Sequence, residues 1–344
     1  MKNKRVKIYY GGFLKKAGGA FLHARNMQIG LEKIGWNVDI ITLDSLPLLL
    51  RFVPHAIEKI VNLFLLPFGF IYKAKITKIL YKNFFSSETD LFIFEDIYLS
   101  WNSEVASITL LHAVWSDNLQ AFNPSLSKET SFRKYELDII NSIKHPLVTV
   151  SKPYRDYICD NHFCNELRKS IEVIELGVDI NQSNNFNEKN NRKSLIFTGS
   201  LEARKNVFFL IDVFEELFKK DNEYSLTIVG DGPDKEKLDE IAQYKKLPIT
   251  FTGKVQYSEV SKELSKHGTY IHTSTKESFS FSLLEAKLAG LKTFAYSKLE
   301  VPPEFIDHGL DSFKIDEWAK AIYEDFGSMK EINVEKYSID YMVN

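Results

Sequence analysis

Residues 270–290 read Tyr-Ile-His-Thr-Ser-Thr-Lys-Glu-Ser-Phe-Ser-Phe-Ser-Leu-Leu-Glu-Ala-Lys-Leu-Ala-Gly. The apolar run at the start predicts a strand over 270–273, and the apolar positions that follow Ser280 predict a helix. The first-turn amides of such a helix have no partner within the helix, so these amides and the helix dipole form a site for an anion such as a diphosphate. Glu277 precedes the helix and Glu285 lies on it, and each carboxylate can accept hydrogen bonds from paired sugar hydroxyls.

The rest of the chain alternates short apolar runs with longer amphipathic segments, a pattern typical of strands and helices in turn. In the second half, strands are predicted at 195–198, 226–229, 249–252 and 270–273. In the first half, strands are predicted at 6–10, 38–42, 91–94, 108–111, 147–150 and 171–174. Buried strands joined by helices indicate a parallel sheet that is covered on both faces.

A polar stretch over 181–193 separates the two halves, and its composition is that of a linker. We therefore predict an α/β fold with two Rossmann-like, doubly wound domains, 1–180 and 194–325, that face each other across a cleft. The tail 326–344 is predicted to pack back on the first domain. Open α/β sheets bind ligands beyond the carboxyl ends of their strands, so the cleft is the expected site.

The composition indicates a soluble globular protein in a reducing compartment. Hydrophobic residues make up 44% and charged residues 26% of the chain, and a net charge of −2 gives no basic field for nucleic acid. Cys159 and Cys164 have no partner at the spacing of a zinc or redox motif. The basic N-terminus is not followed by an apolar signal core, and the apolar stretch 60–72 is shorter than the roughly 20 residues that span a membrane. A cytoplasmic protein is expected.

The spacing of the two glutamates resembles the motif of a known family. Glu277 and Glu285 lie eight residues apart, with aromatic and small residues between them. This pattern resembles the E-x7-E motif of retaining GT-B glycosyltransferases, notably glycosyltransferase family 4. The resemblance implies that Glu277 holds the donor sugar and that Glu285 holds the nucleotide ribose. The alternative is a pair of solvated charges on a surface helix.

The same resemblance assigns donor binding to the segment between the two glutamates, namely Phe279, Ser280, Phe281 and Ser282. The family usually has glycines on both sides of the first aromatic residue. This chain has Ser278 and Ser280 at those positions, and serine narrows the freedom of the backbone.

A second match follows the strand 195–198, where Gly199 and Ser200 precede Arg204 and Lys205 at a helix start. A fixed cation here would stabilise the charge of a departing nucleotide diphosphate without a metal ion. The family commonly has an arginine directly after the glycine and a lysine some five residues later. Lys205 matches that lysine, Ser200 occupies the place of the arginine, and Arg204 is the candidate to supply its charge. The alternative is a solvated helix start.

Two further turns extend the resemblance. Gly230-Asp231-Gly232-Pro233 follows a strand and resembles the turn that shapes the nucleotide pocket in the family, although a tight turn alone explains it equally well. Lys254 lies in a segment, Phe-Thr-Gly-Lys-Val, whose backbone commonly contacts the base. Gly230, Gly232 and Lys254 are therefore assigned to the predicted donor site, together with Gly199 and Ser200.

The first half carries two candidates for the acceptor side. Gly18 and Gly19 precede a helix and resemble the glycine-rich acceptor-side loop of the family, where glycine lets the backbone approach a phosphate or sugar. A tight turn alone is the alternative. His112 follows the strand 108–111, at a carboxyl end where sites lie. Family members often have a functional histidine beside the transferred sugar at this point, and a satisfied structural histidine is the alternative.

The resemblance implies a retaining, metal-independent transferase that moves a sugar from a nucleotide-diphosphate sugar to a glycan or lipid-linked acceptor, in cell-surface polysaccharide or glycolipid synthesis. Glu277, Lys205, Arg204 and His112 are the predicted catalytic residues. The nucleotide sugar is the co-substrate, and no metal ion, other cofactor or nucleic acid is expected. A nucleotide-sugar epimerase of the same fold and a catalytically silent nucleotide-sugar-binding subunit are the alternatives.

Residues 46–85 are the candidate membrane contact. They are rich in leucine, phenylalanine and isoleucine, and their only acid is Glu58. Their basic residues are Arg51, Lys59, Lys73, Lys75, Lys78 and Lys82. A basic amphipathic segment can lie in the interface of an anionic membrane, so peripheral attachment to the cytoplasmic face is expected. The alternative is a pair of buried helices in the first domain.

Overall fold

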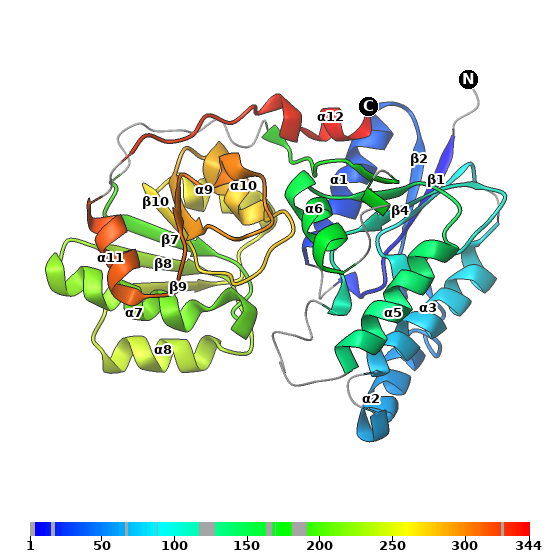
Figure 1. Cartoon of the computed structure of the whole chain (residues 1–344), viewed down its shortest axis with the longest axis horizontal. Helices are drawn as coiled ribbons and strands as arrows, with labels where there is room; N and C mark the ends of the chain where they lie inside the picture. Colours follow the sequence, from blue (N-terminus) through cyan, green and yellow to red (C-terminus); the bar gives the residue numbers. More distant parts are fainter. Residues whose placement is uncertain are drawn as a thin grey trace. The chain divides into compact units, whose positions relative to one another are not determined.

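The computed structural model describes residues 4–14, 18–65, 68–87, 89–116, 128–162, 167–168, 170–180, 191–324 and 327–344. The chain divides into two compact units (Figure 1). The first unit comprises Met1–Val178 together with Lys336–Asn344, and the second comprises Asp179–Glu335. Each unit has one parallel sheet with helices packed around it, so the predicted α/β class is confirmed.

The first unit is built on a six-stranded sheet in the order β2-β1-β3-β4-β5-β6. Its strands are β1 (Arg5–Tyr9), β2 (Asn37–Ile41), β3 (Leu91–Phe94), β4 (Ala106–Leu111), β5 (Leu147–Thr149) and β6 (Ile171–Val173). Its helices are α1 (Gly19–Lys33), α2 (Val53–Leu65), α3 (Gly69–Phe85), α5 (Lys128–Ser142), α6 (Lys152–Asn161) and α12 (Ile339–Val343), with 3-10 helices at Leu43–Ser45 and Ile97–Leu99.

Successive residues of these strands point to opposite faces of the sheet, and both faces are buried. On one face, Ile8 and Ile93 belong to a cluster that includes Met27 of α1. On the other face, Tyr9 and neighbouring aromatic residues of β3 pack with Tyr81 of α3. Burial on both sides explains why the central strand β3 is a continuous apolar run.

The C-terminal segment of the chain belongs to the first unit. The backbone amide of Val178 donates to Tyr337 at 2.9 Å, and the amide of Ile339 donates back to Val178 at 3.1 Å. The helix α12 packs on α1 where Gly30 has no side chain, since a Cβ atom there would lie 2.6 Å from the Val343 side chain. This close approach fixes the end of the described chain against the first sheet's helix layer.

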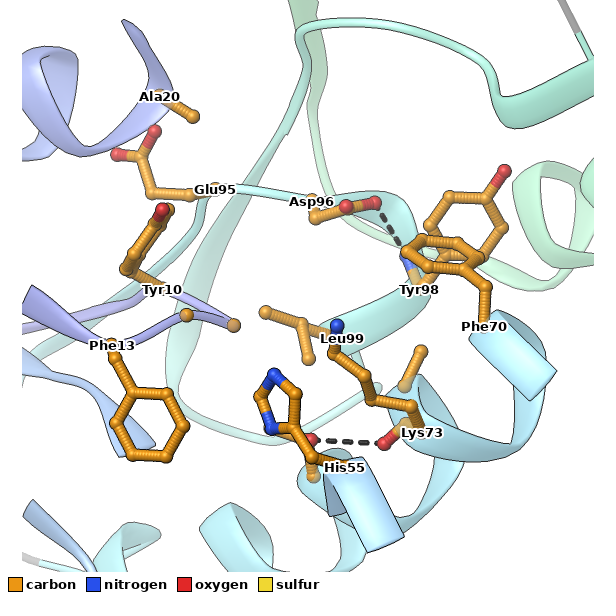
Figure 2. Close-up of a pocket in the computed structure, with 14 residues that line it drawn as sticks. Tyr10, Phe13, Ala20, His55, Phe70, Lys73, Glu95, Asp96, Tyr98 and Leu99 are labelled. Carbon is orange, nitrogen blue, oxygen red and sulfur yellow. Dashed lines mark hydrogen bonds between the residues drawn. The ribbon is translucent and has the colours of Figure 1, made fainter. Parts of the chain in front are cut away.

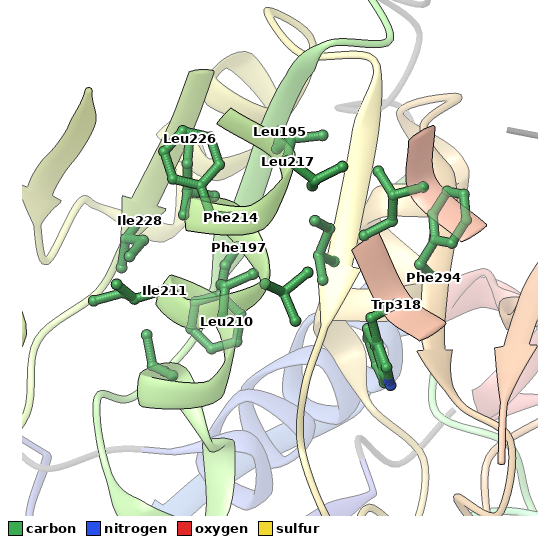
Figure 3. Packing of buried hydrophobic residues seen from close by; sticks show 14 of the residues in the cluster. Leu195, Phe197, Leu210, Ile211, Phe214, Leu217, Leu226, Ile228, Phe294 and Trp318 are labelled. Carbon is green, nitrogen blue, oxygen red and sulfur yellow. The ribbon is translucent and has the colours of Figure 1, made fainter. Parts of the chain in front are cut away.

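The second unit repeats the plan with a six-stranded sheet in the order β12-β11-β10-β7-β8-β9. Its strands are β7 (Ser194–Thr198), β8 (Ser225–Val229), β9 (Ile249–Gly253), β10 (Thr269–His272), β11 (Lys292–Tyr296) and β12 (His308–Leu310). Its helices are α7 (Val207–Lys220), α8 (Lys235–Tyr244), α9 (Tyr257–Leu264), α10 (Phe281–Leu288) and α11 (Ile315–Glu324). Phe197 of β7, Phe214 of α7 and Trp318 of α11 belong to one buried cluster, which Figure 3 shows.

The predicted strands are all present, each beginning within two residues of its expected start, whereas β11 and β12 were not predicted. The predicted helix after Ser280 is α10, with Ser280 as its N-cap residue. Of the predicted linker 181–193, residues 181–190 lie outside the described residues.

The helices α2 and α3 form a hairpin that only partly fits the buried-helix alternative (Figure 1). α3 buries Ile71 and Tyr81 against the unit, as a core helix does. α2 instead leaves Leu63 and Phe64 exposed at 79% and 81%. None of the helices that the structure describes has both the length and the apolar character needed to cross a bilayer.

Candidate active site

The side chain of Glu277 is the centre of a compact charged cluster in the second unit. Lys205 donates to its Oε1 atom at 2.5 Å, and the Arg204 guanidinium lies 3.3 Å from the same oxygen. The imidazole of His272, the last residue of β10, lies 3.4 Å from it. Arg204 and Lys205 end a 3-10 helix after β7, and the Thr273 hydroxyl donates to the Lys205 carbonyl at 2.9 Å. This bond joins the loops that follow β7 and β10.

The cations decide the charge of Glu277. Burial by itself would raise the pKa of this carboxyl, but Lys205, His272 and Arg204 hold it well below its ordinary value. His272 is fully buried, and burial lowers its pKa, so its ring is neutral near pH 7. The site therefore presents an ionised carboxylate beside two cations, and the same cations can bind a phosphate group.

Ser280 begins α10 in an unusual backbone conformation. Its φ angle is 68°, in the left-handed region, and its hydroxyl accepts a hydrogen bond from the Leu283 amide at 3.4 Å. The amides of the first turn include those of Phe281 and Ser282, as expected for an anion site. Phe279 is 2% exposed, and its ring packs edge-on against Phe281, so only its backbone is left to contact a donor.

Glu285 lies in the middle of α10 and is partly exposed. Burial raises the pKa of this carboxyl to about 7, and a hydrogen bond with Tyr257 of α9 opposes the shift. No cation is among the causes of this shift, in contrast to Glu277. The carboxylate therefore has hydrogen-bonding capacity left for the hydroxyls of a ligand.

The predicted glycines bring two loops of the second unit together. The amide of Gly199 donates to Val229 at 3.0 Å, and a Cβ atom at Gly230 would lie 1.8 Å from the Gly199 carbonyl oxygen. Gly230 also has a φ of 148°, which residues with a side chain rarely adopt. A Cβ atom at Gly232 would lie 2.3 Å from the Leu201 carbonyl oxygen. These glycines are needed for loop packing, whatever ligand contacts their backbone makes.

Ser200 and Lys254 lie at the exposed edge of this region. The Ser200 hydroxyl donates to Glu202 at 2.9 Å, and Glu202 also pairs with Arg204 at 3.3 Å. Arg204 lies 3.3 Å from Glu277, although Ser200, and not Arg204, occupies the position where the resemblance predicts an arginine. Lys254 follows β9 and is exposed.

In the first unit, His112 follows β4 and is held by a buried carboxylate. Its Nε2 atom lies 2.7 Å from Glu95, and Glu95 lies 2.9 Å from Nδ1 of His23. Among the described residues, this is the cluster of histidine and carboxylate side chains that could hold a metal ion. Sequence reasoning missed Glu95 and His23; two acids directly after β3 were the available signal for Glu95.

A pocket of about 310 Å³ adjoins Glu95 (Figure 2). Its aromatic walls are Tyr10, Phe13, Phe70 and Tyr98, and its polar walls are His55, Lys73, Glu95 and Asp96. Burial raises the pKa of Asp96 to about 7. Gly18 and Gly19 do not line this pocket, whereas Ala20 does, and residues 15–17 of the predicted acceptor loop lie outside the described residues.

The second unit and its flanking residues are similar to known proteins. Residues 179–329 match the family model described as glycosyl transferases group 1. An uncharacterised glycosyltransferase of Methanocaldococcus jannaschii is 32% identical over 173 residues, which are 47% of this chain and 43% of that protein. The alpha-monoglucosyldiacylglycerol synthase of Streptococcus pneumoniae is 22% identical over 215 residues, 58% of this chain and 48% of that protein. The matches thus span less than half the length of these curated relatives.

The fold comparison covers the whole chain. The structure of HepE from Anabaena in complex with UDP and glucose has a TM-score of 0.63 and 14% identity, covering 99% of this chain and 94% of that one. Such a likeness at low identity shows the fold alone. Residues 179–329 thus match the glycosyl transferases group 1 family, in a chain whose two α/β units have the GT-B fold.

Proposed function

We propose that this protein is a retaining, metal-independent glycosyltransferase of the family 4 type. It would move a sugar from a nucleotide-diphosphate sugar onto a glycan or lipid-linked acceptor in polysaccharide or glycolipid synthesis. The observation that carries the proposal is the meeting of Glu277, Lys205 and Arg204 directly before α10. Glu285, on the helix itself, completes the set with a carboxylate for the ribose.

The chemistry of the cluster suits departure of a diphosphate. Lys205 and Arg204 would stabilise the charge that develops on the leaving nucleotide, together with the free amides of α10. Glu277 would accept hydrogen bonds from hydroxyls of the donor sugar. The acceptor hydroxyl would attack on the face that the diphosphate leaves, and the departing phosphate would take its proton. The UDP and glucose in the HepE complex and the lipid product named for the S. pneumoniae relative support these two substrate classes.

Turnover of nucleotide sugars tests the proposal. The purified protein is incubated with a panel of nucleotide-diphosphate sugars, with and without acceptor alcohols, in EDTA. We expect release of nucleotide diphosphate that depends on the acceptor, and a product with the anomeric configuration of the donor. Conversion of the donor without any acceptor would instead indicate the epimerase. No turnover of any donor would indicate the silent subunit. Activity that is absent in EDTA and restored by a divalent ion would contradict metal independence.

The α2–α3 hairpin supports the further proposal of peripheral attachment to the cytoplasmic face of an anionic membrane. Around α2 the exposed apolar side chains are Leu48, Leu49, Phe52, Ile60, Leu63 and Phe64, with exposed fractions between 57% and 87%. Exposed leucines and phenylalanines in such number suit an apolar environment rather than water. The basic residues of the same hairpin provide the charge complementarity to anionic lipid.

Co-sedimentation with vesicles tests this attachment. Binding of the full chain should increase with the anionic lipid content, decrease with salt, and weaken when Leu63 and Phe64 are changed to serine. Tyr244→Ser is the matched control, because Tyr244 is 88% exposed in the second unit. Equal recovery in the soluble fraction with and without anionic vesicles would contradict attachment.

A further inference from the structure

The carboxylate of Glu95 lies between two imidazole rings in the first unit. Its Oε2 atom is 2.9 Å from Nδ1 of His23 and 2.7 Å from Nε2 of His112, and its Oε1 atom is 3.0 Å from Nδ1 of His23. The side chains of Glu95 and His23 are 1% and 0% exposed, whereas that of His112 is 17% exposed. The two rings meet edge-on, with centroids 5.1 Å apart. His112 is therefore the member of this triad that a ligand can reach.

The hydrogen bonds determine where the protons lie. Burial by itself would raise the pKa of Glu95, but the two histidines lower it to about 2, so Glu95 is ionised. An ionised carboxylate only accepts hydrogen bonds, so each ring nitrogen that faces it carries a proton. Nε2 of His112 therefore carries a proton, and in the neutral form of this ring the Nδ1 atom has a free lone pair.

His23 is consistent with the same assignment. Its Nε2 atom is buried and has no hydrogen-bond partner among the described residues. A proton on that nitrogen would be a buried donor without an acceptor, which is unfavourable. With its proton on Nδ1 instead, the neutral ring satisfies Glu95 and leaves no donor unpaired.

The backbone around the triad holds it in place. The Glu95 amide donates to the Tyr9 carbonyl at 3.0 Å, which fixes the end of β3 against β1. Two residues beyond His112, the Val114 amide donates to the Tyr154 hydroxyl at 2.9 Å. The contacts of 2.7–3.0 Å are those of direct hydrogen bonds, and a zinc ion bound by these atoms would require the loss of both protons.

We propose that Glu95 is a positioning residue that locks His112 in the tautomer with a proton on Nε2, so that Nδ1 accepts a hydrogen bond from a hydroxyl of the sugar substrate. His23 holds the opposite side of the carboxylate and keeps it from turning. The role in turnover rests on the proposed glycosyltransferase function, whereas the tautomer is a property of the free protein.

Nitrogen-15 NMR of the free protein, labelled at histidine, tests the tautomer without any assay of activity. In the neutral rings we expect a protonated Nε2 and an unprotonated Nδ1 for His112, and the opposite tautomer for His23. In Glu95→Gln the amide can donate to Nε2, so the signals of His112 should shift toward the other tautomer. A wild-type His112 with its proton on Nδ1, or signals that move when zinc is added at one equivalent, would overturn the proposal.

Turnover tests the consequence. Glu95→Gln should lower kcat/KM at least about tenfold, as a wrong histidine tautomer does in other enzymes, while Glu95→Asp restores part of it. His112→Asn, whose amide oxygen can take the place of Nδ1, should retain more activity than His112→Gln. Melting temperatures identify variants that fail to fold, and NMR of wild-type protein then still decides the tautomer. If wild-type protein transfers no sugar, the proposed function fails and the tautomer is judged by NMR alone. Equal activity of Glu95→Gln and wild type, or of the two His112 variants, would contradict the positioning role.

Discussion

At the scale of the residue, Lys205 is the side chain on which the proposed donor site depends most. It is the nearest cation to Glu277, at 2.5 Å, and is itself 9% exposed. We expect Lys205→Ala to lower turnover about 10²-fold or more, as the loss of one preorganised charge does. Arg204→Ala should act in the same direction because its guanidinium reaches the same carboxylate.

Lys193→Ala is the matched control for these two variants. Lys193 pairs with Asp221 at 2.6 Å in the same unit, away from Glu277, so its loss should leave kcat unchanged. Steady-state kinetics with the best donor gives the comparison. Wild-type turnover in both Lys205→Ala and Arg204→Ala would show that the cluster does not stabilise a departing diphosphate.

Glu285 should make nucleotide binding depend on pH. Burial raises the pKa of this carboxyl to about 7, so the fraction ionised increases between pH 6 and pH 8. The ionised form accepts hydrogen bonds from the ribose hydroxyls through both of its oxygens, whereas the protonated form donates through one of them, so the affinity for a nucleoside diphosphate should increase by up to about tenfold over this range. The raised pKa also affects the stability of the ligand-free protein. The free energy of unfolding should decrease as the pH rises from the ordinary pKa of a glutamate, 4.5, through the pKa of about 7 that Glu285 has in the folded protein.

Calorimetric titration at pH 6 and pH 8 measures this effect. Phosphate groups of the ligand also titrate near pH 6. The change in affinity between pH 6 and pH 8 is therefore compared between wild type and Glu285→Gln. The glutamine variant should show a smaller pH dependence. The same dependence in both proteins would mean that Glu285 does not contact the ligand.

Single residues were predicted from the sequence to different degrees. Glu277 and Lys205 were both assigned to the donor site, and the structure brings them into contact. His272 was not assigned to the site, because it is the last residue of a predicted strand and its partner Glu277 lies in the loop that follows. The packing of the Phe279 ring with two other aromatic rings was not predicted, since sequence spacing does not reveal which side of a loop faces the core, and its assignment to the donor stays a prediction.

At the scale of the element, the start of α10 stores backbone strain. Ser280 has a φ of 68° where the related family usually has glycine, and a left-handed conformation costs a residue with a side chain about 1–2 kcal/mol. Glycine removes that cost and loses only a few tenths of a kcal/mol as an N-cap residue. Ser280→Gly should therefore increase the free energy of unfolding by about 1 kcal/mol.

Ser280→Ala is the paired variant, because it keeps the strain and loses the cap. It should lower the free energy of unfolding by about 1 kcal/mol. Urea denaturation of both variants measures the two changes. Equal stability of the alanine and glycine variants would show that the left-handed conformation of Ser280 is not populated in solution.

Elements were predicted well where the sequence pattern is periodic. The apolar residues of β1 and β7 made both strands predictable, because most of their positions are buried. β11 was missed because it begins with Lys292, which is 3% exposed and donates to the Gly327 carbonyl at 3.1 Å. β12 has only the three residues His308–Leu310, too few for a pattern.

At the scale of the whole molecule, the repeated alternation of strands and helices was enough to predict two doubly wound units. The polar stretch 181–193 was predicted to be the linker between them, and its residues 181–190 lie outside the described residues. The exposed apolar surface of α2 could not be predicted, because an apolar stripe reads the same whether it faces a core or a bilayer. The family 4 assignment and the retaining mechanism stay predictions.

Binding of nucleoside diphosphates by the whole chain tests the central claim most directly. Calorimetric titration with a panel of nucleoside diphosphates in EDTA should identify at least one that binds wild-type protein. Glu285→Ala should abolish that binding while the melting temperature stays near the wild-type value. The side chain of Glu285 has no cation among the groups that shift its pKa, only the hydrogen bond with Tyr257, so its removal breaks no ion pair that affects this carboxyl. Near-normal affinity in a folded Glu285→Ala variant, or no binding of any diphosphate by the wild type, would contradict the account.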